Sequence, residues 1–291
     1  MASNTRKRRS LDAHEIDLGP YILKFDKPRV MGILNCTPDS FSGDGLGDNT
    51  ELARRRGRRM FAQGADIVDV GGESTRPGAL PVHADVEIRR VVPVIEALSR
   101  HRPGRTSVDT MKASVAKAAL HAGATIVNDV SGLKDSAMIR VVAEHDAAAI
   151  IMHMKGTPRT MQRKPRYRDV VEDIIGFLEK RIANAESGGV NPRKIMVDPG
   201  IGFGKTLEHN LELIGRLREF KALGKPVVIG VSRKSFIGRL MGDPADDRLE
   251  GSLAAAVLAV REGADIVRVH DVGETVRALR VSSAIHSQFR R

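Results

Sequence analysis

Eight short apolar runs recur along the chain, separated by longer amphipathic stretches. Short apolar runs are typical of buried strands, and amphipathic stretches of this length are typical of helices. Strands that alternate with helices pair in parallel, because each crossover returns the chain to the same end of the sheet. Eight such units favour a closed (β/α)8 TIM barrel over an open sheet. The predicted strands are residues 30–34, 67–70, 106–108, 125–127, 149–152, 195–197, 227–231 and 266–269, and the clearest predicted helices are 52–63, 113–121, 170–185 and 249–261.

One short phrase occurs three times, each time after a stretch rich in Ala and Arg. It starts at Gly64, Gly123 and Gly263 and continues as Ala, then Asp or Thr, then Ile-Val. A glycine fits the left-handed position that ends a helix, and the β-branched run after it fits a buried strand. The repetition supports a β/α plan that continues along the chain.

The residues before the first predicted strand have an apolar pattern of their own around Gly19-Pro20. We expect them to form a β-hairpin that caps the barrel floor. The chain shows no linker or low-complexity segment after this point, so residues 16–291 are predicted to form a single domain. Residues 1–15 are basic and are predicted to be a flexible tail. The apolar positions of the predicted hairpin are Ile16, Leu18, Tyr21, Leu23 and Phe25.

Composition places the chain among ordinary globular proteins, with 41% hydrophobic and 29% charged residues. No apolar run approaches the roughly 20 residues of a membrane span. The basic N-terminus is not followed by the apolar segment of a secretory signal. The single cysteine, Cys36, excludes an internal disulfide and fits a reducing compartment. We therefore expect a cytoplasmic protein that does not act in a membrane.

The formal net charge of +11 suggests an anionic partner. Nucleic-acid binders usually place aromatic residues among their basic ones for stacking. Here aromatic residues make up only 3% of the chain and Trp is absent. The sequence therefore argues against nucleic acid. Basic runs such as residues 54–59 are usually solvated helix faces, and the positive charge also suits an enzyme with a phosphorylated substrate. Charge alone does not decide between these two interpretations.

A polar residue stands at or just after the end of every predicted strand. In a barrel these strand ends converge on the catalytic face. A single Asp, Asn or Ser after a strand is usually the N-cap of the next helix, but capping does not account for the whole set, which includes an Arg. The pattern predicts a site for a polar heterocycle and an anion, built from Asn35, Asp69, Asp109, Asn128, His153, Asp198, Ser232 and Arg268.

Three loops at the same end have unusual compositions. Residues 198–205 place three glycines around Phe203, so the backbone can approach a ligand beside an aromatic ring. Residues 71–78 form a second glycine-rich loop that contains Arg76. Residues 232–235, Ser-Arg-Lys-Ser, open a predicted helix, where free N–H groups favour an anion. The first loop meets neither the Walker A nor the Rossmann pattern.

With these motifs in order from residue 30 to the C-terminus, the sequence resembles the dihydropteroate synthase family. The matching segments are residues 35–41, 69–78, 107–110, 128–129, 152–154, 198–205, 232–235 and 268–271. The resemblance implies a TIM barrel that condenses 6-hydroxymethyl-7,8-dihydropterin diphosphate with para-aminobenzoate. The products are 7,8-dihydropteroate and diphosphate. The family is also typically homodimeric.

The resemblance implies a role for each motif residue. The pterin would be bound by Asp109, Asn128, Asp198, Lys234, Met152 and Val130. The diphosphate would be bound by Asn35, Arg268, His270, Thr75 and Arg76, and the aminobenzoate by Phe203, Lys234, Ser235, Pro77, Thr75 and Phe41. Asn35 would also be a ligand of Mg²⁺, which keeps several waters and needs few protein ligands. The catalytic set would be Asp109, Lys234, Arg268 and Asn35.

The resemblance also implies chemistry that depends on positioning and electrostatics rather than on a nucleophilic side chain. Diphosphate would leave as a pterin methylene cation forms, and the arylamine would then attack. Two mobile loops would close over the site, one with Thr37, Asp39 and Phe41 and the other with Thr75, Arg76 and Pro77. Sulfonamides, which mimic aminobenzoate, would compete for its place.

The sequence departs from the family pattern at Cys36, in place of an aliphatic residue, and after Phe41, where Ser-Gly-Asp-Gly follows. Two alternatives to a synthase remain, a methyltetrahydrofolate-dependent methyltransferase and a pterin-binding paralogue without activity. For His153, packing at a strand end and a functional role are equally open, and we leave it outside the catalytic set. We expect Lys205 to lie at the surface or at a helix start. Asp69 and Glu73 are expected to orient the second loop.

Overall fold

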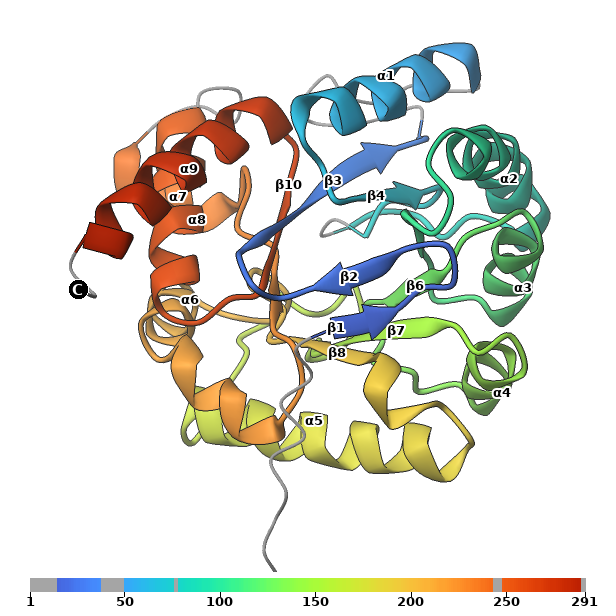
Figure 1. The fold of residues 1–291 in the computed structure, drawn as a ribbon. Coiled ribbons are helices and arrows are strands. Elements are labelled where there is room, and N and C mark those ends of the chain that lie inside the picture. The colour runs from blue at the N-terminus through green and yellow to red at the C-terminus, as the bar shows by residue number, and fades with distance from the viewer. Residues whose placement is uncertain (1–14, 38–49, 76–77, 243–247, 289–291) are drawn as a thin grey trace, which may run out of the picture.

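Eight parallel strands form a ring, as the alternation of apolar runs and helices predicts (Figure 1). The computed structural model describes residues 15–37, 50–75, 78–242 and 248–288. In sequence order the strands are β3 (Arg29–Asn35), β4 (Ile67–Gly71), β5 (Thr106–Asp109), β6 (Ile126–Asp129), β7 (Ala148–Met152), β8 (Ile195–Asp198), β9 (Val228–Ile229) and β10 (Ile266–Val269). Each pairs in parallel with its neighbours in the order β8-β7-β6-β5-β4-β3-β10-β9.

The ring closes between β8 and the segment just before β9. Val197 and Val227 form an isolated parallel bridge there, and the Val197 N–H donates to the Pro226 carbonyl at 3.0 Å. The closure confirms the prediction of a (β/α)8 barrel. β9 itself has two residues where the sequence predicts a strand over 227–231, because only Val228 and Ile229 are in register with β10.

Helices cover the outside of the ring (Figure 1). All four clearest helix predictions are confirmed, and α3 and α8 have the predicted bounds. The helices are α1 (Thr50–Gln63), α2 (Ala84–His101), α3 (Ala113–His121), α4 (Ser136–Glu144), α5 (Val170–Ser187), α6 (Leu207–Gly215), α7 (Ser235–Met241), α8 (Leu249–Arg261) and α9 (Val272–Gln288), with short 3₁₀ helices η1 (Pro192–Lys194) and η2 (Leu217–Leu223).

Alternation along each strand separates two apolar layers. In β4, Val68 and Val70 belong to the large core between strands and helices, together with helix residues such as Leu98. Ile67 points the other way and belongs to a smaller core inside the barrel. Asp69 shares the inward side with Ile67, because side chains two apart in a strand lie on the same face.

The smaller core is closed from below by a hairpin of β1 (Glu15–Asp17) and β2 (Ile22–Lys24), which lies across one end of the ring in Figure 1. Its residues Ile16, Leu18 and Leu23 are buried against the inward residues of the barrel. The predicted hairpin is confirmed. Because this end is filled with apolar side chains, only the opposite end can accept a ligand.

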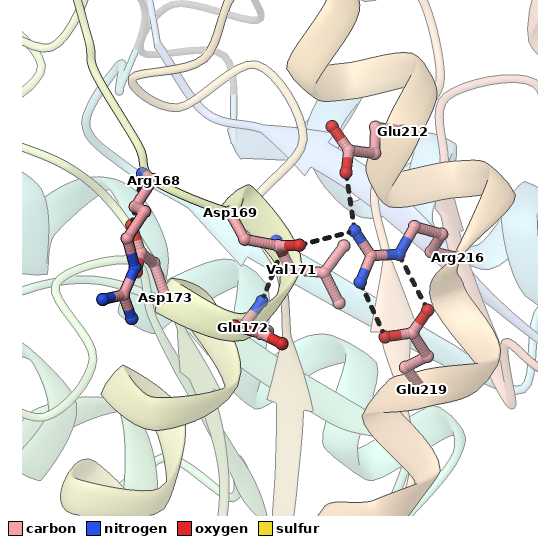
Figure 2. A network of polar contacts seen from close by, with 8 residues as sticks. All are labelled: Arg168, Asp169, Val171, Glu172, Asp173, Glu212, Arg216 and Glu219. Atoms are coloured by element: carbon pink, nitrogen blue, oxygen red, sulfur yellow. Dashed lines mark hydrogen bonds and ion pairs between the residues drawn. The ribbon is translucent and has the colours of Figure 1, made fainter.

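An arginine ties the start of α5 to the end of α6 (Figure 2). Asp169 caps α5 by accepting hydrogen bonds from the Val171 and Glu172 N–H groups. The Arg216 guanidinium contacts Asp169 at 3.0 Å and also pairs with Glu212 and Glu219. The network lies at the surface, so it fixes the relative positions of the two helices more than it adds to stability.

Gly104 lies under the hairpin, and we predict that replacing it weakens the barrel floor. Its φ is +77°, and an added Cβ would lie 2.8 Å from Tyr21 Cβ and 3.1 Å from the Leu18 carbonyl oxygen. Gly104→Ala should therefore lower the free energy of unfolding in urea by about 2 kcal/mol. The matched control is Gly176→Ala inside α5, where the added Cβ meets no heavy atom within 4 Å. It should stabilise the protein by roughly 0.5–1 kcal/mol. Equal effects of the two variants would contradict the prediction.

Candidate active site

Polar side chains from separate strands meet at the end of the barrel opposite the hairpin. Asn35, Asp109, Asn128 and Asp198 are each at or next to the last position of their strand, and Arg268 is the third of the four residues of β10. Their neighbours in sequence, such as Val108 and Val127, face the helices. Alternation therefore turns the polar residues inward, and the structure brings together the strand-end residues that the sequence selected.

Arg268 is the centre of a buried ion network. Its Nε contacts Asp69 Oδ2 at 2.7 Å, and its Nη2 contacts Asp109 Oδ2 at 2.6 Å. The Asn128 amide donates to the same oxygen of Asp69 at 3.0 Å. Asp69 is fully buried and Asp109 is 9% exposed. One cation and one amide thus partly offset the cost of burying two carboxylates.

Each of these carboxylates keeps one oxygen without a partner. Within the part of the chain that the structure describes, Asp69 Oδ1 and Asp109 Oδ1 are buried and accept no hydrogen bond. An unpaired acceptor in the interior costs roughly 1–3 kcal/mol, and more when it is charged. Such oxygens fit a ligand that brings its own N–H donors into the mouth.

Burial raises the pKa of Asp109 to about 7, and the positive charge of Arg268 offsets only part of this effect. The pKa of Asp198 is also raised by burial, although its carboxylate accepts a 2.7 Å hydrogen bond from the Gly200 N–H. Buried carboxyl groups with raised pKa values near one charged partner, here Arg268, are typical of functional sites.

An apolar rim borders the carboxylates. Val130 and Met152 pack with Met154 and Met161, and Met111 and Phe203 pack against them. The Lys234 ammonium lies 4.3 Å from the centroid of the Phe203 ring, within cation–π distance. A flat aromatic ligand can be held here between methionine side chains and a phenyl ring.

The loop before α7 joins this rim to the end of β10. Ser232 Oγ lies 3.0 Å from His270 Nδ1 and also accepts the His270 N–H at 3.2 Å. Arg233 has a φ of +56°, and its guanidinium contacts both carboxylate oxygens of Asp271 at 3.1 and 2.6 Å. These bonds fix the positions of His270 and of Lys234, which begins α7 as its N-cap residue.

The predicted site residues differ in their burial, and some of them lie outside the described residues. Asn35 and Asp109 border Gly71 on either side, since a Cβ on Gly71 would lie 3.9 Å from Asn35 Oδ1 and 3.6 Å from Asp109 Cβ. Thr75 is half-buried, Thr37 is buried and Ser235 is exposed. Predictions outside the described residues concern Asp39, Phe41, Arg76, Pro77, the altered segment 43–45 and most of the tail, although β1 begins at Glu15, its last residue.

The expectation for Lys205 is confirmed in part, and the expectation for Asp69 is wrong. Lys205 directly precedes Thr206, the N-cap of α6, so it lies at a helix start. It is not at the surface but 3% exposed, a burial that the sequence does not encode. Asp69 does not orient the second loop but faces Asn128 and Arg268. Its position between two outward valines is the signal that could have revealed this. Glu73, by contrast, contacts the segment that follows the second loop, because it accepts the Val82 N–H at 3.4 Å. It also pairs with Lys112.

His153 is buried, which fits the packing interpretation. Its ring meets Phe177 edge to face, with centroids 4.9 Å apart. Sequence reasoning missed Met111, Met154 and Met161 as parts of the apolar rim. Among the described residues, no three His, Cys, Asp or Glu side chains gather as metal ligands. No helix in the described ranges is both long and apolar enough to cross a membrane.

The closed ring of eight parallel strands and the polar mouth at their carboxyl ends place the chain in the class of (β/α)8-barrel enzymes. Residues 31–270 match the family model described as "Pterin binding enzyme". The Escherichia coli K12 protein named "Dihydropteroate synthase" is 45% identical over 262 residues, which are 90% of this chain and 93% of the relative. The chain therefore belongs to the dihydropteroate synthase family of pterin-binding enzymes.

Solved structures agree with this assignment. Dihydropteroate synthase from Yersinia pestis, in complex with a sulfonamide drug, superposes with a TM-score of 0.91 at 42% identity and covers 94% of this chain and 99% of its own. The Xanthomonas albilineans enzyme in complex with 7,8-dihydropteroate gives a TM-score of 0.83 at 42% identity, with coverages of 94% and 98%.

The raised pKa of Asp109 predicts that pterin binding depends on pH. The carboxyl keeps its proton below pH 7, and only the ionised form can accept N–H donors with both oxygens. The affinity for a dihydropterin should therefore rise about tenfold from pH 6 to pH 8 and level off above. Isothermal titration calorimetry measures this, and Asp109→Asn should bind weakly without the pH dependence.

The raised pKa of Asp109 also affects the stability of the folded protein. Because the pKa of Asp109 lies above its usual value of 3.8, the ionised carboxyl lowers the stability of the folded state. This destabilisation is absent below about pH 4 and complete above about pH 7.

Pterin affinity that is constant from pH 6 to pH 8 in the parent protein would show that Asp109 does not control binding.

Proposed function

We propose that this chain catalyses the dihydropteroate synthase reaction of folate biosynthesis. In this reaction the amine of para-aminobenzoate displaces diphosphate from the methylene carbon of 6-hydroxymethyl-7,8-dihydropterin diphosphate. The observation that carries the proposal is the pair of buried, half-satisfied carboxylates beside Arg268. They suit a substrate with N–H donors at one end and an anion at the other.

The pterin would lie in the barrel mouth between the polar strand ends and the apolar rim. Asp109 and Asp198 would accept hydrogen bonds from its ring, and the Asn128 amide would bind its edge. Met152 and Val130, which are almost completely buried, would contact the ring face. The ammonium of Lys234 adds a donor on the open side of the ring.

The diphosphate would bind where β3 and β10 end, with Asn35, Arg268 and His270 as ligands. Arg268 is held by two carboxylates in the structure, and a bidentate exchange onto phosphate oxygens suits its planar guanidinium. The Ser232 hydroxyl would hold the His270 ring in one orientation. Thr75 and Arg76 would contribute from the second loop.

The residues at this edge also fit Mg²⁺. The amide oxygen of Asn35 and the carboxylate of Asp109 both border Gly71, and magnesium prefers oxygen ligands of this kind. Asn35 would be the protein ligand, with diphosphate oxygens and water completing the shell. Bound magnesium would neutralise charge on the diphosphate as it leaves.

The aminobenzoate would lie against Phe203 and Lys234, whose ring and ammonium contact each other at 4.3 Å. The Ser235 hydroxyl, at the start of α7, would receive the carboxylate. Thr75, Pro77 and Phe41 would close the slot from the two loops. Sulfonamides, one of which the Yersinia pestis relative binds, would compete for the same slot in this chain.

Bond breaking precedes bond making in the proposed mechanism. The carbon–oxygen bond to diphosphate breaks first, and the negative charges of Asp109 and Asp198 favour the positive charge that develops on the pterin methylene. The amine nitrogen of aminobenzoate then bonds to that carbon and loses one proton to solvent. Asp109, Lys234, Arg268 and Asn35 act by binding and orienting the reactants, without covalent catalysis.

Two other functions are disfavoured by specific residues. A methyltetrahydrofolate-dependent methyltransferase would not need a diphosphate site, yet Arg268 and His270 are held in place by Asp69, Asp109 and Ser232. A non-catalytic pterin-binding paralogue would not need an aminobenzoate slot, yet the ring of Phe203 and the ammonium of Lys234 face each other.

The proposal extends to the assembly and its location. Leu258 on α8 and Val281 and Ile285 on α9 are each more than half exposed. These neighbouring helices are a candidate interface for a homodimer, since exposed apolar patches often mark contacts between proteins. A cytoplasmic location is supported by the free thiol of Cys36, which is buried and has a pKa raised by burial to about 12.

Diphosphate release from the purified protein tests the proposed activity. The assay contains dihydropterin diphosphate, magnesium and para-aminobenzoate, with each omitted in turn. We predict release coupled one to one to dihydropteroate formation and dependent on all three. Tight pterin binding without product would support the non-catalytic alternative. Demethylation of methyltetrahydrofolate would support the methyltransferase.

For the dimer, Leu258→Glu combined with Val281→Glu should halve the mass measured by sedimentation. The reason is that two charges would have to be buried at the interface. The matched control is Leu211→Glu on α6, an exposed leucine on a different helix, which should leave the mass unchanged. A parent protein that sediments as a monomer would contradict the proposal.

A further inference from the structure

The loop after β8 is held at several points of its backbone. The Gly202 N–H donates to Asn210 Oδ1 at 2.7 Å, and the Gly202 carbonyl accepts from Gln162 at 2.8 Å. The Gly204 carbonyl accepts from the Tyr167 hydroxyl at 2.8 Å. The Phe203 carbonyl, between them, accepts from a buried lysine side chain. The loop is thus fixed on both sides of the residue that faces the aminobenzoate slot.

That side chain is Lys205. Its Nζ donates to the Phe203 carbonyl at 3.0 Å and lies 3.0 Å from His153 Nδ1. Lys205 is 3% exposed. Burial lowers the pKa of its amino group well below the usual value, and the charge of Asp198 offsets only part of this effect. A buried amino group is costly unless its hydrogen bonds are satisfied, and here the Phe203 carbonyl and His153 are its partners.

His153 provides a rigid acceptor for this lysine. Its backbone N–H donates to the Asp198 carbonyl at 3.0 Å, and its ring packs edge to face against Phe177. Burial, followed by the charge of Lys205, lowers the pKa of His153 to about 2, so the ring is neutral. A neutral ring with an Nδ1 lone pair can accept from the Lys205 amino group, which links the end of β7 to the loop after β8.

Because the loop contains three glycines, it depends on its hydrogen bonds to keep a fixed shape. Gly200, Gly202 and Gly204 all have positive φ, and a Cβ on Gly200 would lie 2.0 Å from the His153 carbonyl oxygen. The backbone therefore packs directly on His153 and reverses direction around Phe203. Without the Lys205 donor, the Phe203 carbonyl would lose its partner, and three flexible glycines would let the ring move.

We propose that Lys205, anchored on His153, is a positioning residue that fixes Phe203 and thereby sets the geometry of the slot for the second substrate. The inference rests on the proposed function, because it assigns the Phe203 slot to the aminobenzoate. Lys205 does not touch the substrate. It acts through the Phe203 carbonyl, and the Phe203 ring in turn faces Lys234.

The test is Lys205→Met, which keeps the shape of the side chain and removes its donors. At pH 8.5 we expect the KM for aminobenzoate to rise about tenfold, the effect of losing one buried hydrogen bond. The KM for dihydropterin diphosphate should stay within twofold. The Tm should equal or exceed that of the parent, since a buried amino group that is costly to desolvate has been replaced by an apolar group. A residue with a merely structural role would instead lower the Tm and affect both KM values.

Lys225→Met is the matched control. Lys225 is also largely buried and donates to a backbone carbonyl, that of Pro192 at 2.7 Å, but it precedes β9 at the opposite end of the barrel. Its loss should leave the KM for aminobenzoate unchanged. If Lys205→Met and Lys225→Met shift this KM equally, the inference is wrong.

A double-mutant cycle tests whether Lys205 affects aminobenzoate binding through Phe203. Phe203→Leu alone should raise the KM for aminobenzoate, and adding Lys205→Met should raise it less than twofold further, because both changes disturb the same contact. Fully additive changes would overturn the inference. An inactive parent protein would refute the proposed function, whereas an active parent with an unaffected Lys205→Met variant would refute only the role of Lys205.

Discussion

The ion network of Arg268 with Asp69 and Asp109 is the constraint on which the site depends. Two carboxylates are buried at the mouth of a barrel whose lower half is filled with apolar side chains. Neither could remain charged there without a cation, and the guanidinium leaves one oxygen of each carboxylate unpaired. The ion network therefore pairs the buried charges well enough for the protein to fold, and it leaves carboxylate oxygens that can accept hydrogen bonds from a ligand.

The fold converts this chemistry into a site through simple strand geometry. The inward side of each strand is apolar near the hairpin and polar near the carboxyl end, as Ile67 and Asp69 show within β4. The hairpin excludes ligands from one end, and the methionines beside Phe203 form a soft rim at the other. A flat heterocycle with an anionic tail matches both the polar floor and the apolar rim of this mouth.

Much of the fold and of the site could be predicted from sequence, because local rules determine them. Buried strands are continuous β-branched runs, and polar residues at strand ends converge in any barrel. The pairing of charged residues within the site could not be predicted, because Arg268 contacts Asp69 from a position 199 residues away in the sequence. The burial of Lys205 was also beyond reach, since a lysine before a helix usually faces water, and its direction here follows from the packing of the loop on His153.

The most direct measurement compares the binding of dihydropterin and dihydropterin diphosphate to the parent protein and to Arg268→Gln. Calorimetry at pH 9 keeps Asp109, whose pKa is about 7, ionised in the parent. If Arg268 transfers from the carboxylates to the diphosphate, the variant should lose tenfold or more in affinity for the diphosphate. The affinity for the free pterin should fall less, because Arg268 affects this ligand only through the charge of Asp109. Equal losses for both ligands would contradict the role of the ion network in diphosphate binding.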